Sequence, residues 1–357
     1  MSYKNKIKAL ILLFLTKKRK KKFELSNARN FLFFRYDRIG DMIISTPVFR
    51  ELKSKFPFAK ITVLASEKNK EVLLNNPYVD KIVTNHKHNF LKDLKKLIKL
   101  RRFNYDVCIE FDHSVIPHSI LRLLIIQPKF IISVAKDGRY GIPGSRLKLY
   151  DLYTPRNDRM HYREICLATL KPFFIQPNSL KYDLFLSKEV ITRAENFLLR
   201  LKDSFLVGIN IYGAVPGKFI DKDSFLKICN ELNSKHKDIH FILLYEPNRL
   251  SEVEKYLDLS IDNITLSYET STIHDVAAII KNVDLIITPD TSISHVASVF
   301  NKPIVTIHEN NKLSHKLFAP VSDDRKVVFS PRKNSLVGFN VARVVEYANE
   351  LINKIKK

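Results

Sequence analysis

The chain has 357 residues, of which 45% are hydrophobic, and Lys and Arg outnumber Asp and Glu by 60 to 37. This composition indicates a globular protein, and the length has room for two domains with separate cores. The formal net charge of +23 indicates an anionic partner such as nucleic acid, anionic lipid or a phosphorylated saccharide, but does not choose among them. The three cysteines are too widely spaced for a zinc site or a disulfide framework, so a reducing cytoplasm is the natural setting.

The N-terminus combines an apolar run at residues 7–15 with a basic run at 17–22. Nine residues are too few for a membrane span, which needs about 20, and no small-residue cleavage site follows, which argues against a signal peptide. Two interpretations stay open for this stretch. One is an interfacial helix whose basic neighbours meet anionic headgroups, and the other is a helix packed on the protein beside a solvated basic linker. We treat residues 1–25 as a separate, membrane-apposing segment.

From residue 31 onwards, short apolar runs alternate with segments of helical periodicity. In the first half we expect strands at 31–34, 61–65, 76–83 and 106–111, and helices at 42–55, 67–74, 90–103 and 161–174. The basic face of the helix at 90–103 is interpreted as a solvated surface, with a role in holding acceptor phosphates as the weaker alternative.

A turn-rich stretch with two prolines at 172–179 marks a domain boundary, after which the alternation starts again. Strands are expected at 206–211, 239–245 and 283–288, and helices at 223–233, 272–281, 291–300 and 341–355. Such alternation in both halves predicts two doubly wound α/β domains that face each other, residues 26–185 and 186–357.

The first candidate site follows the strand at 31–34. In open α/β sheets, ligands gather outside the carboxyl ends of the strands, and there Asp41 stands at the start of a helix. A carboxylate in this position can cap the helix or act in catalysis, and the spacing alone favours capping. Asp112 and His113 follow the strand at 106–111 in the same way, as cleft residues or as turn formers.

The second candidate site follows the strand at 283–288. Asp290 or Thr291 can cap the next helix, whose free N–H groups would form an anion site suited to a diphosphate. His295 lies about one turn into this helix, as a structural histidine or as a ligand. Lys218 lies in a loop after the strand at 206–211, where it can contact phosphate or remain a solvated charge.

Three stretches resemble glycosyltransferase family 9, the bacterial heptosyltransferases. The first is Arg-Tyr-Asp-Arg-Ile-Gly-Asp at 35–41, followed by Thr46-Pro47, Leu52 and Phe56-Pro57. The second is Asn-Ile-Tyr-Gly-Ala at 210–214 with Lys218-Phe219, and the third is 284–297, which contains Thr-Pro-Asp-Thr-Ser-Ile-Ser-His. These matches lie in the order expected for the family and cover most of the chain.

The resemblance implies a GT-B architecture, with an N-terminal acceptor domain, a C-terminal nucleotide-sugar domain and a cleft between them. It also implies inversion at the anomeric carbon, with Asp41 as the general base, and neither a metal nor another cofactor. Around Asp41, the expected acceptor-binding residues are Arg35, Arg38, Asp112 and His113. The expected donor-binding residues are Asn210, Gly213, Lys218, Asp290, Thr291, Ser292 and His295.

The implied activity is transfer of heptose from ADP-heptose to the lipopolysaccharide inner core, by a cytoplasmic enzyme that is peripheral on the inner face of the inner membrane. Ser292 and Glu309 stand where the family usually has glycine, and the turn at 245–247 lacks the family's small residues. Another nucleotide sugar is therefore an alternative donor, and a silent family member that only binds nucleotide sugar is a second alternative. A basic nucleic-acid-binding protein is a third, although the scattered basic residues and the lack of a binding module argue against nucleic acid as a partner.

Overall fold

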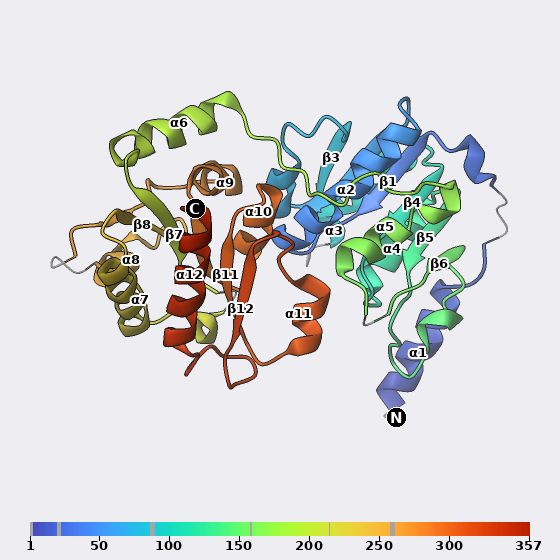
Figure 1. Cartoon of the computed structure of the whole chain (residues 1–357). Coiled ribbons are helices and arrows are strands. Elements are labelled where there is room, and N and C mark those ends of the chain that lie inside the picture. Colours follow the sequence, from blue (N-terminus) through green and yellow to red (C-terminus); the bar gives the residue numbers. More distant parts are fainter. Residues whose placement is uncertain (1–2, 20–22, 86–89, 158, 214, 258–260) are drawn as a thin grey trace. The chain divides into compact units, whose positions relative to one another are not determined.

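The computed structural model describes residues 3–19, 23–85, 90–157, 159–213, 215–257 and 261–357. The chain divides into two compact units, Met1–Asp183 and Leu184–Lys357 (Figure 1). Each unit is built on one parallel sheet with helices on its faces.

Unit 1 contains a six-stranded sheet in the order β3-β2-β1-β4-β5-β6. β1 lies between β2 and β4, and all the pairings of this sheet are parallel. The strand order therefore reverses at β1, which makes its carboxyl end the topological switch point where ligands bind in such sheets. The strands are β1 (Asn30–Phe34), β2 (Lys60–Ser66), β3 (Lys81–Asn85), β4 (Val107–Glu110), β5 (Phe130–Val134) and β6 (Leu152–Thr154).

The centre of unit 1 is built from aromatic residues. Residues 31–34 of β1 are all buried, as expected for a parallel strand covered on both faces, and the Phe33 ring packs against Phe49 and Phe111. The helices of the unit are α1 (Tyr3–Leu15), α2 (Ile39–Lys55), α3 (Phe90–Arg101), α4 (Pro117–Ile126) and α5 (Tyr162–Ala168).

Unit 2 repeats this plan with the strand order β12-β11-β10-β7-β8-β9. Its strands are β7 (Phe205–Asn210), β8 (Ile239–Leu244), β9 (Ile264–Leu266), β10 (Leu285–Pro289), β11 (Ile304–His308) and β12 (Arg325–Phe329). Its helices are α6 (Lys188–Leu198), α7 (Lys222–Lys235), α8 (Leu250–Val253), α9 (Ile273–Asn282), α10 (Ser292–Val299), α11 (Lys312–Phe318) and α12 (Val341–Ile355).

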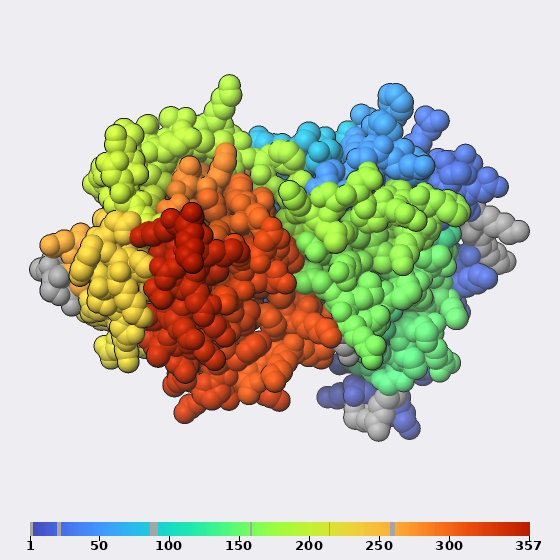
Figure 2. All heavy atoms as spheres, viewed as in Figure 1, coloured from blue at the N-terminus to red at the C-terminus, as the bar shows by residue number. Residues whose placement is uncertain are grey.

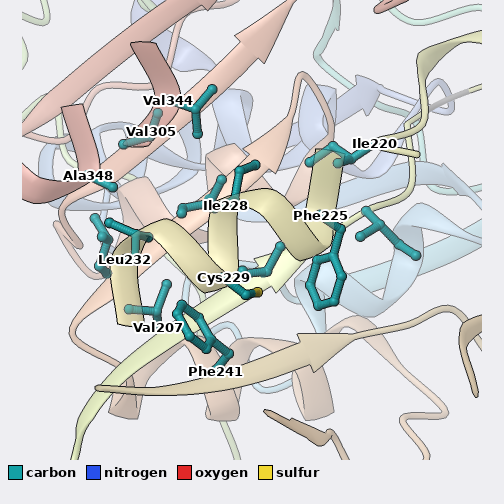
Figure 3. Close-up of a cluster of buried hydrophobic side chains, with 14 of the residues drawn as sticks. Val207, Ile220, Phe225, Ile228, Cys229, Leu232, Phe241, Val305, Val344 and Ala348 are labelled. Atoms are coloured by element: carbon teal, nitrogen blue, oxygen red, sulfur yellow. The ribbon is translucent and has the colours of Figure 1, made fainter. Parts of the chain in front are cut away.

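The core of unit 2 joins the sheet to α7 and α12. Figure 3 shows side chains of α7 gathered with Val207 and Phe241 of the strands and with Val344 and Ala348 of α12, and all of these residues are buried. This packing fixes the central strands, from whose carboxyl ends the candidate donor residues project.

The predicted α/β class with two doubly wound domains is confirmed. Two helix predictions need correction. The segment at 67–74 forms only a short 3-10 turn, Asn69–Leu73. The helix predicted at 161–174 ends at Ala168, and a separate 3-10 turn contains Pro172. The helix does not continue through Pro172 because proline removes a backbone donor from a helix interior. The predictions also left out β5, β6, β9, β11 and β12, and the helices α4, α6, α8 and α11.

The three cysteines, Cys108, Cys166 and Cys229, are free and buried. Burial raises the pKa of each thiol, that of Cys166 to about 12. They therefore serve as small apolar side chains rather than as nucleophiles.

The N-terminal helix α1 packs on unit 1. Ala9 and Leu12 are buried in the same core cluster as residues of α4, and Arg19 donates to the carbonyl of Pro128 and pairs with Asp151. In the space-filling view, α1 is the dark blue segment at the surface of this unit (Figure 2). Within the described part of the chain, no helix combines the length and apolar character that a membrane span requires. The other face of α1 exposes Tyr3, Ile7, Leu10, Ile11 and Phe14.

Candidate functional site

Asp41 lies in the first turn of α2, directly beyond the carboxyl end of β1. Its Oδ2 accepts a hydrogen bond of 3.3 Å from the backbone N–H of Arg38, so the carboxylate does cap the helix. Its side chain is still 20% exposed, and Oδ1 lies 3.4 Å from Nη2 of Arg35. Asp41 is thus fixed by the helix start and by a cation while part of it faces solvent.

Arg35 is the buried cation of this site, with 2% of its side chain exposed. It lies 3.1 Å from Asp37, donates from Nε to the carbonyl of Asp41 at 3.0 Å, and packs near the rings of Phe111 and Tyr162. Burial lowers the pKa of Arg35, but the two carboxylates raise it above the ordinary value overall, so the guanidinium stays charged. It is therefore placed to orient the carboxylates, whereas its contact with an acceptor stays a prediction.

Asp37 and Asp112 complete an acidic cluster beside Asp41. Burial is the main cause that raises the pKa of Asp37, to about 6, against the opposing effect of Arg35. Burial also raises the pKa of Asp112, whose Oδ1 accepts a 2.7 Å hydrogen bond from the N–H of Ser114. Arg35 thus pairs with two carboxylates, Asp37 and Asp41, and Asp112 is near enough to raise the pKa of Asp37.

His113 and Arg38 are the other two predicted acceptor residues. His113 Nδ1 lies 3.2 Å from the Tyr162 hydroxyl, and that hydroxyl donates to the carbonyl of Phe111 at 2.6 Å. Burial lowers the pKa of His113, so the ring is neutral near pH 7 and can donate to or accept from an uncharged hydroxyl. The side chain of Arg38 is exposed and free to meet an anionic group.

A buried ion pair behind this cluster was missed by sequence reasoning. Lys136 Nζ lies 2.8 Å from Glu110 Oε2, with at most 1% of either side chain exposed, and the Ser119 hydroxyl donates to the same carboxylate. Lys136 also donates to the carbonyl of Asp112 at 2.5 Å. The pair therefore fixes the strand end that carries Asp112. The one signal in the sequence is a lysine just beyond a mostly apolar strand.

In unit 2, Asn210 and Gly213 shape the loop after β7. Asn210 Nδ2 donates to Tyr212 O and to Thr288 Oγ1, each at 2.9 Å, and ties the ends of β7 and β10 together. A Cβ on Gly213 would lie 2.1 Å from the carbonyl oxygen of Lys218, so only glycine allows this close approach. Asn210 and Gly213 thus build the loop that presents Lys218, and direct contact of either with a donor stays a prediction.

The start of α10 follows β10, as predicted. Thr291 caps the helix through a 3.3 Å hydrogen bond from the N–H of Ile293 to its hydroxyl. Asp290 Oδ2 lies 3.5 Å from Nδ1 of the buried His308. Burial raises the pKa of Asp290, but His308, His295 and Lys218 more than compensate and lower it overall. The cap therefore carries an ionised carboxylate at Asp290. His295 is buried on the first turn beyond it, and Ser292 is half-buried.

Lys218, the predicted phosphate contact, already has an anionic partner. Its Nζ lies 3.1 Å from Oε2 of Glu309, with 22% and 13% of the two side chains exposed. Glu309 is the residue that stands where the resemblance predicts glycine, and it also accepts from the N–H of Asn334.

No group of three or more His, Cys, Asp or Glu residues suited to a metal ion occurs in the described ranges. The acidic pair Asp221 and Asp223, which superficially resembles a metal site, belongs to the start of α7. Asp221 caps this helix by accepting from the N–H of Ser224 at 2.9 Å.

The sequence matches the model of glycosyltransferase family 9 (heptosyltransferase) over residues 95–337. It is 24% identical over 309 residues to putative lipopolysaccharide heptosyltransferase 4 of Escherichia coli K12, covering 83% of this chain and 79% of that protein. It is 26% identical over 288 residues to lipopolysaccharide heptosyltransferase 3 of the same organism, covering 75% and 79%.

Solved structures show the same fold. A glycosyl transferase family 9 protein from Veillonella parvula matches with a TM-score of 0.74 and 17% identity, covering 91% of this chain and 97% of that one. The Escherichia coli heptosyltransferase WaaC with ADP matches with a TM-score of 0.72 and 14% identity, covering 90% and 99%. The two doubly wound units thus form a GT-B fold.

Proposed function

Since this chain belongs to glycosyltransferase family 9 and is a glycosyltransferase, we propose that it transfers heptose from ADP-heptose to the lipopolysaccharide inner core. The observation that carries the proposal is the partly exposed Asp41 at the switch point of unit 1, held by the buried Arg35. The relatives named as lipopolysaccharide heptosyltransferases support the donor and acceptor class.

In the proposed reaction, an acceptor hydroxyl attacks the anomeric carbon of the donor and gives its proton to the Asp41 carboxylate. The bond from that carbon to the diphosphate breaks with inversion, and the electron pair leaves on the phosphate oxygen. Arg35 and the N–H of Arg38 hold Asp41 in one orientation, so little reorganisation is needed when the hydroxyl arrives. Arg38, Asp112 and His113 are proposed to bind the acceptor.

The departing diphosphate is proposed to bind to unit 2. Lys218 and the N-terminus of α10 supply positive charge, and an anion at a helix start also meets free N–H groups. Thr291 and His295 flank this start, and Asn210 joins β7 to β10 beneath it. The proposed reaction uses Asp41 and these groups of unit 2, without a metal or another cofactor.

We also propose that the enzyme acts at the cytoplasmic face of the inner membrane, to which α1 attaches it. The exposed apolar face of α1 is accompanied by exposed lysines, and no acidic residue occurs from 3 to 19. A membrane-surface helix has this pattern, and each lysine near an anionic surface contributes about 1 kcal/mol. The exposed lysines are Lys4, Lys6, Lys8, Lys17 and Lys18.

Membrane attachment is tested by co-sedimentation with anionic phospholipid vesicles. Replacing Leu10 and Phe14 with Gln should weaken binding at least tenfold, because burial of each apolar side chain contributes about 1.5 kcal/mol or more. Leu199→Gln in unit 2 is the control, since Leu199 and Leu10 are 66% and 68% exposed. Equal binding by the Leu10/Phe14 variant and the control would reject α1 as the attachment.

The transferase proposal is tested with Asp41→Asn, which keeps the shape of the side chain but removes the base. Transfer should fall at least 100-fold, the lower range for a general base, while donor binding stays unchanged. Asp203→Asn, at an exposed carboxylate, should retain full activity. Near-normal turnover of the Asp41 variant would remove this residue from the base role.

The donor is identified by thermal shift with a panel of nucleotide sugars, because a ligand that binds only the folded state raises the melting temperature. We expect ADP-heptose to give the largest shift. A larger shift with another nucleotide sugar would reassign the donor. Tight, salt-sensitive binding of nucleic acid with no nucleotide-sugar response would instead favour a nucleic-acid-binding protein.

A further inference from the structure

The carboxylate of Glu309 is paired with Lys218, the cation that is proposed to bind the diphosphate. Glu309 follows β11, and the distance of 3.1 Å between its Oε2 and Lys218 Nζ makes this a direct, charge-assisted contact. Both side chains are largely covered, so the pair is less screened than an ordinary surface ion pair.

Several contacts hold Glu309 in this position. Its side chain accepts from the N–H of Asn334, and its carbonyl accepts from the N–H of Asn311 at 2.7 Å. The N–H of Asn310 donates to the carbonyl of Arg332 at 2.8 Å. The carboxylate is therefore attached to a loop that is itself tied to the segment after β12, and it cannot simply withdraw from Lys218 without loss of these contacts.

We propose that Glu309 is a specificity-determining residue that makes the site bind the sugar-linked diphosphate better than the free diphosphate left after transfer. This inference rests on the proposed function and deepens it, because it assigns product discrimination to a side chain beside the phosphate-binding lysine.

Transfer of the sugar changes the charge of the diphosphate. In the donor, the sugar esterifies the terminal phosphate. When the bond to the anomeric carbon breaks, the electron pair stays on the phosphate oxygen and the proton of the acceptor hydroxyl goes to Asp41. The product then carries nearly one more negative charge, since the second pKa of a terminal phosphate is about 6.

A fixed carboxylate repels the more negative ligand more strongly. Lys218 is already paired with Glu309 at 3.1 Å before any ligand arrives. The extra charge of the product therefore finds no uncommitted cation at Lys218. Because Glu309 stays beside Lys218, the more negative product is held less tightly and its release becomes faster.

The test is isothermal titration of the full-length protein with ADP and with ADP-heptose, in the wild type and in Glu309→Gln. Glutamine keeps the shape and the acceptor for the Asn334 N–H but removes the charge. We expect Glu309→Gln to bind ADP about tenfold more tightly than the wild type does, and ADP-heptose about threefold more tightly. The gain in binding free energy is then larger for ADP by about 0.7 kcal/mol. Stronger product inhibition and a lower kcat should accompany this change.

Glu350→Gln is the matched control, because Glu350 pairs with Lys326 on the surface of the same unit, and it should change neither affinity. If Glu309→Gln changes the affinity for both ligands by the same factor, or changes neither affinity, the inference is overturned while the transferase proposal stays intact. No binding of either ligand to the wild type would refute the proposed donor, and with it the inference. If Glu309→Gln is unstable, Glu309→Ala must show the same preference for ADP.

Discussion

The buried pair of Lys136 and Glu110 should make unit 1 sensitive to a single substitution. At 2.8 Å, the two charges attract by about 6 kcal/mol if the effective dielectric constant is about 20. Desolvation of the lysine offsets part of this attraction. Lys136→Met leaves Glu110 buried without its cation, and loss of one partner from such a pair costs about 3–5 kcal/mol.

The double variant Glu110→Gln, Lys136→Met should recover much of this loss, because it leaves no uncompensated charge. Urea unfolding followed by circular dichroism measures both variants. Lys354→Met is the control, since Lys354 pairs with Asp324 while 66% of its side chain is exposed, and it should cost at most about 1 kcal/mol. A loss below about 1 kcal/mol in Lys136→Met, or a double variant no more stable than the single one, would refute the reasoning.

The raised pKa of Asp37, about 6, means that the folded state binds more protons than the unfolded state between about pH 4 and pH 6. The free energy of unfolding should thus fall as pH rises through this window, and Asp37→Asn should lose this contribution. Urea titrations at several pH values measure the free energy of unfolding of the variant and of the wild type. The same dependence on pH in both proteins would contradict the prediction. Gly213→Ala should destabilise unit 2 by about 1–3 kcal/mol and weaken ADP binding in calorimetry, because the new Cβ would meet the Lys218 carbonyl oxygen at 2.1 Å. Gly217→Ala is the control, since the atom nearest to its new Cβ, the Asn334 carbonyl oxygen, is 3.5 Å away. Thr291→Ala should cost about 1 kcal/mol through loss of the α10 cap, and an unchanged urea midpoint would show that the cap contributes nothing.

Sequence reasoning located the strand-turn-helix units that carry both candidate half-sites. Residues 31–34 are an unbroken apolar run followed by polar turn residues, and the start of α10 carries its own capping residue. Local pattern determines such units, so they can be read from short windows. The short edge strands β6 and β9 have only three residues each and carry too little pattern to be recognised.

Two ion pairs beside the candidate residues are long-range and escaped prediction. Glu110 and Lys136 meet because β4 and β5 are neighbours in the sheet, and Lys218 meets Glu309 across 91 positions of sequence. The sequence also predicts Arg35 as an acceptor contact, whereas its burial beside Asp37 and Asp41 makes it first a support for those carboxylates. Burial of this kind depends on tertiary packing, which a window around residue 35 does not contain.

The three covered thiols have a practical consequence. Cys108, Cys166 and Cys229 are buried and their thiols are poorly ionised. Maleimide dyes should therefore not react with them in the folded protein. One new cysteine in place of the exposed Lys70 and another in place of the exposed Lys222 would then carry a fluorophore pair, one dye per unit. Energy transfer between the dyes would report any domain movement as nucleotide sugar is added, without first removing a native side chain.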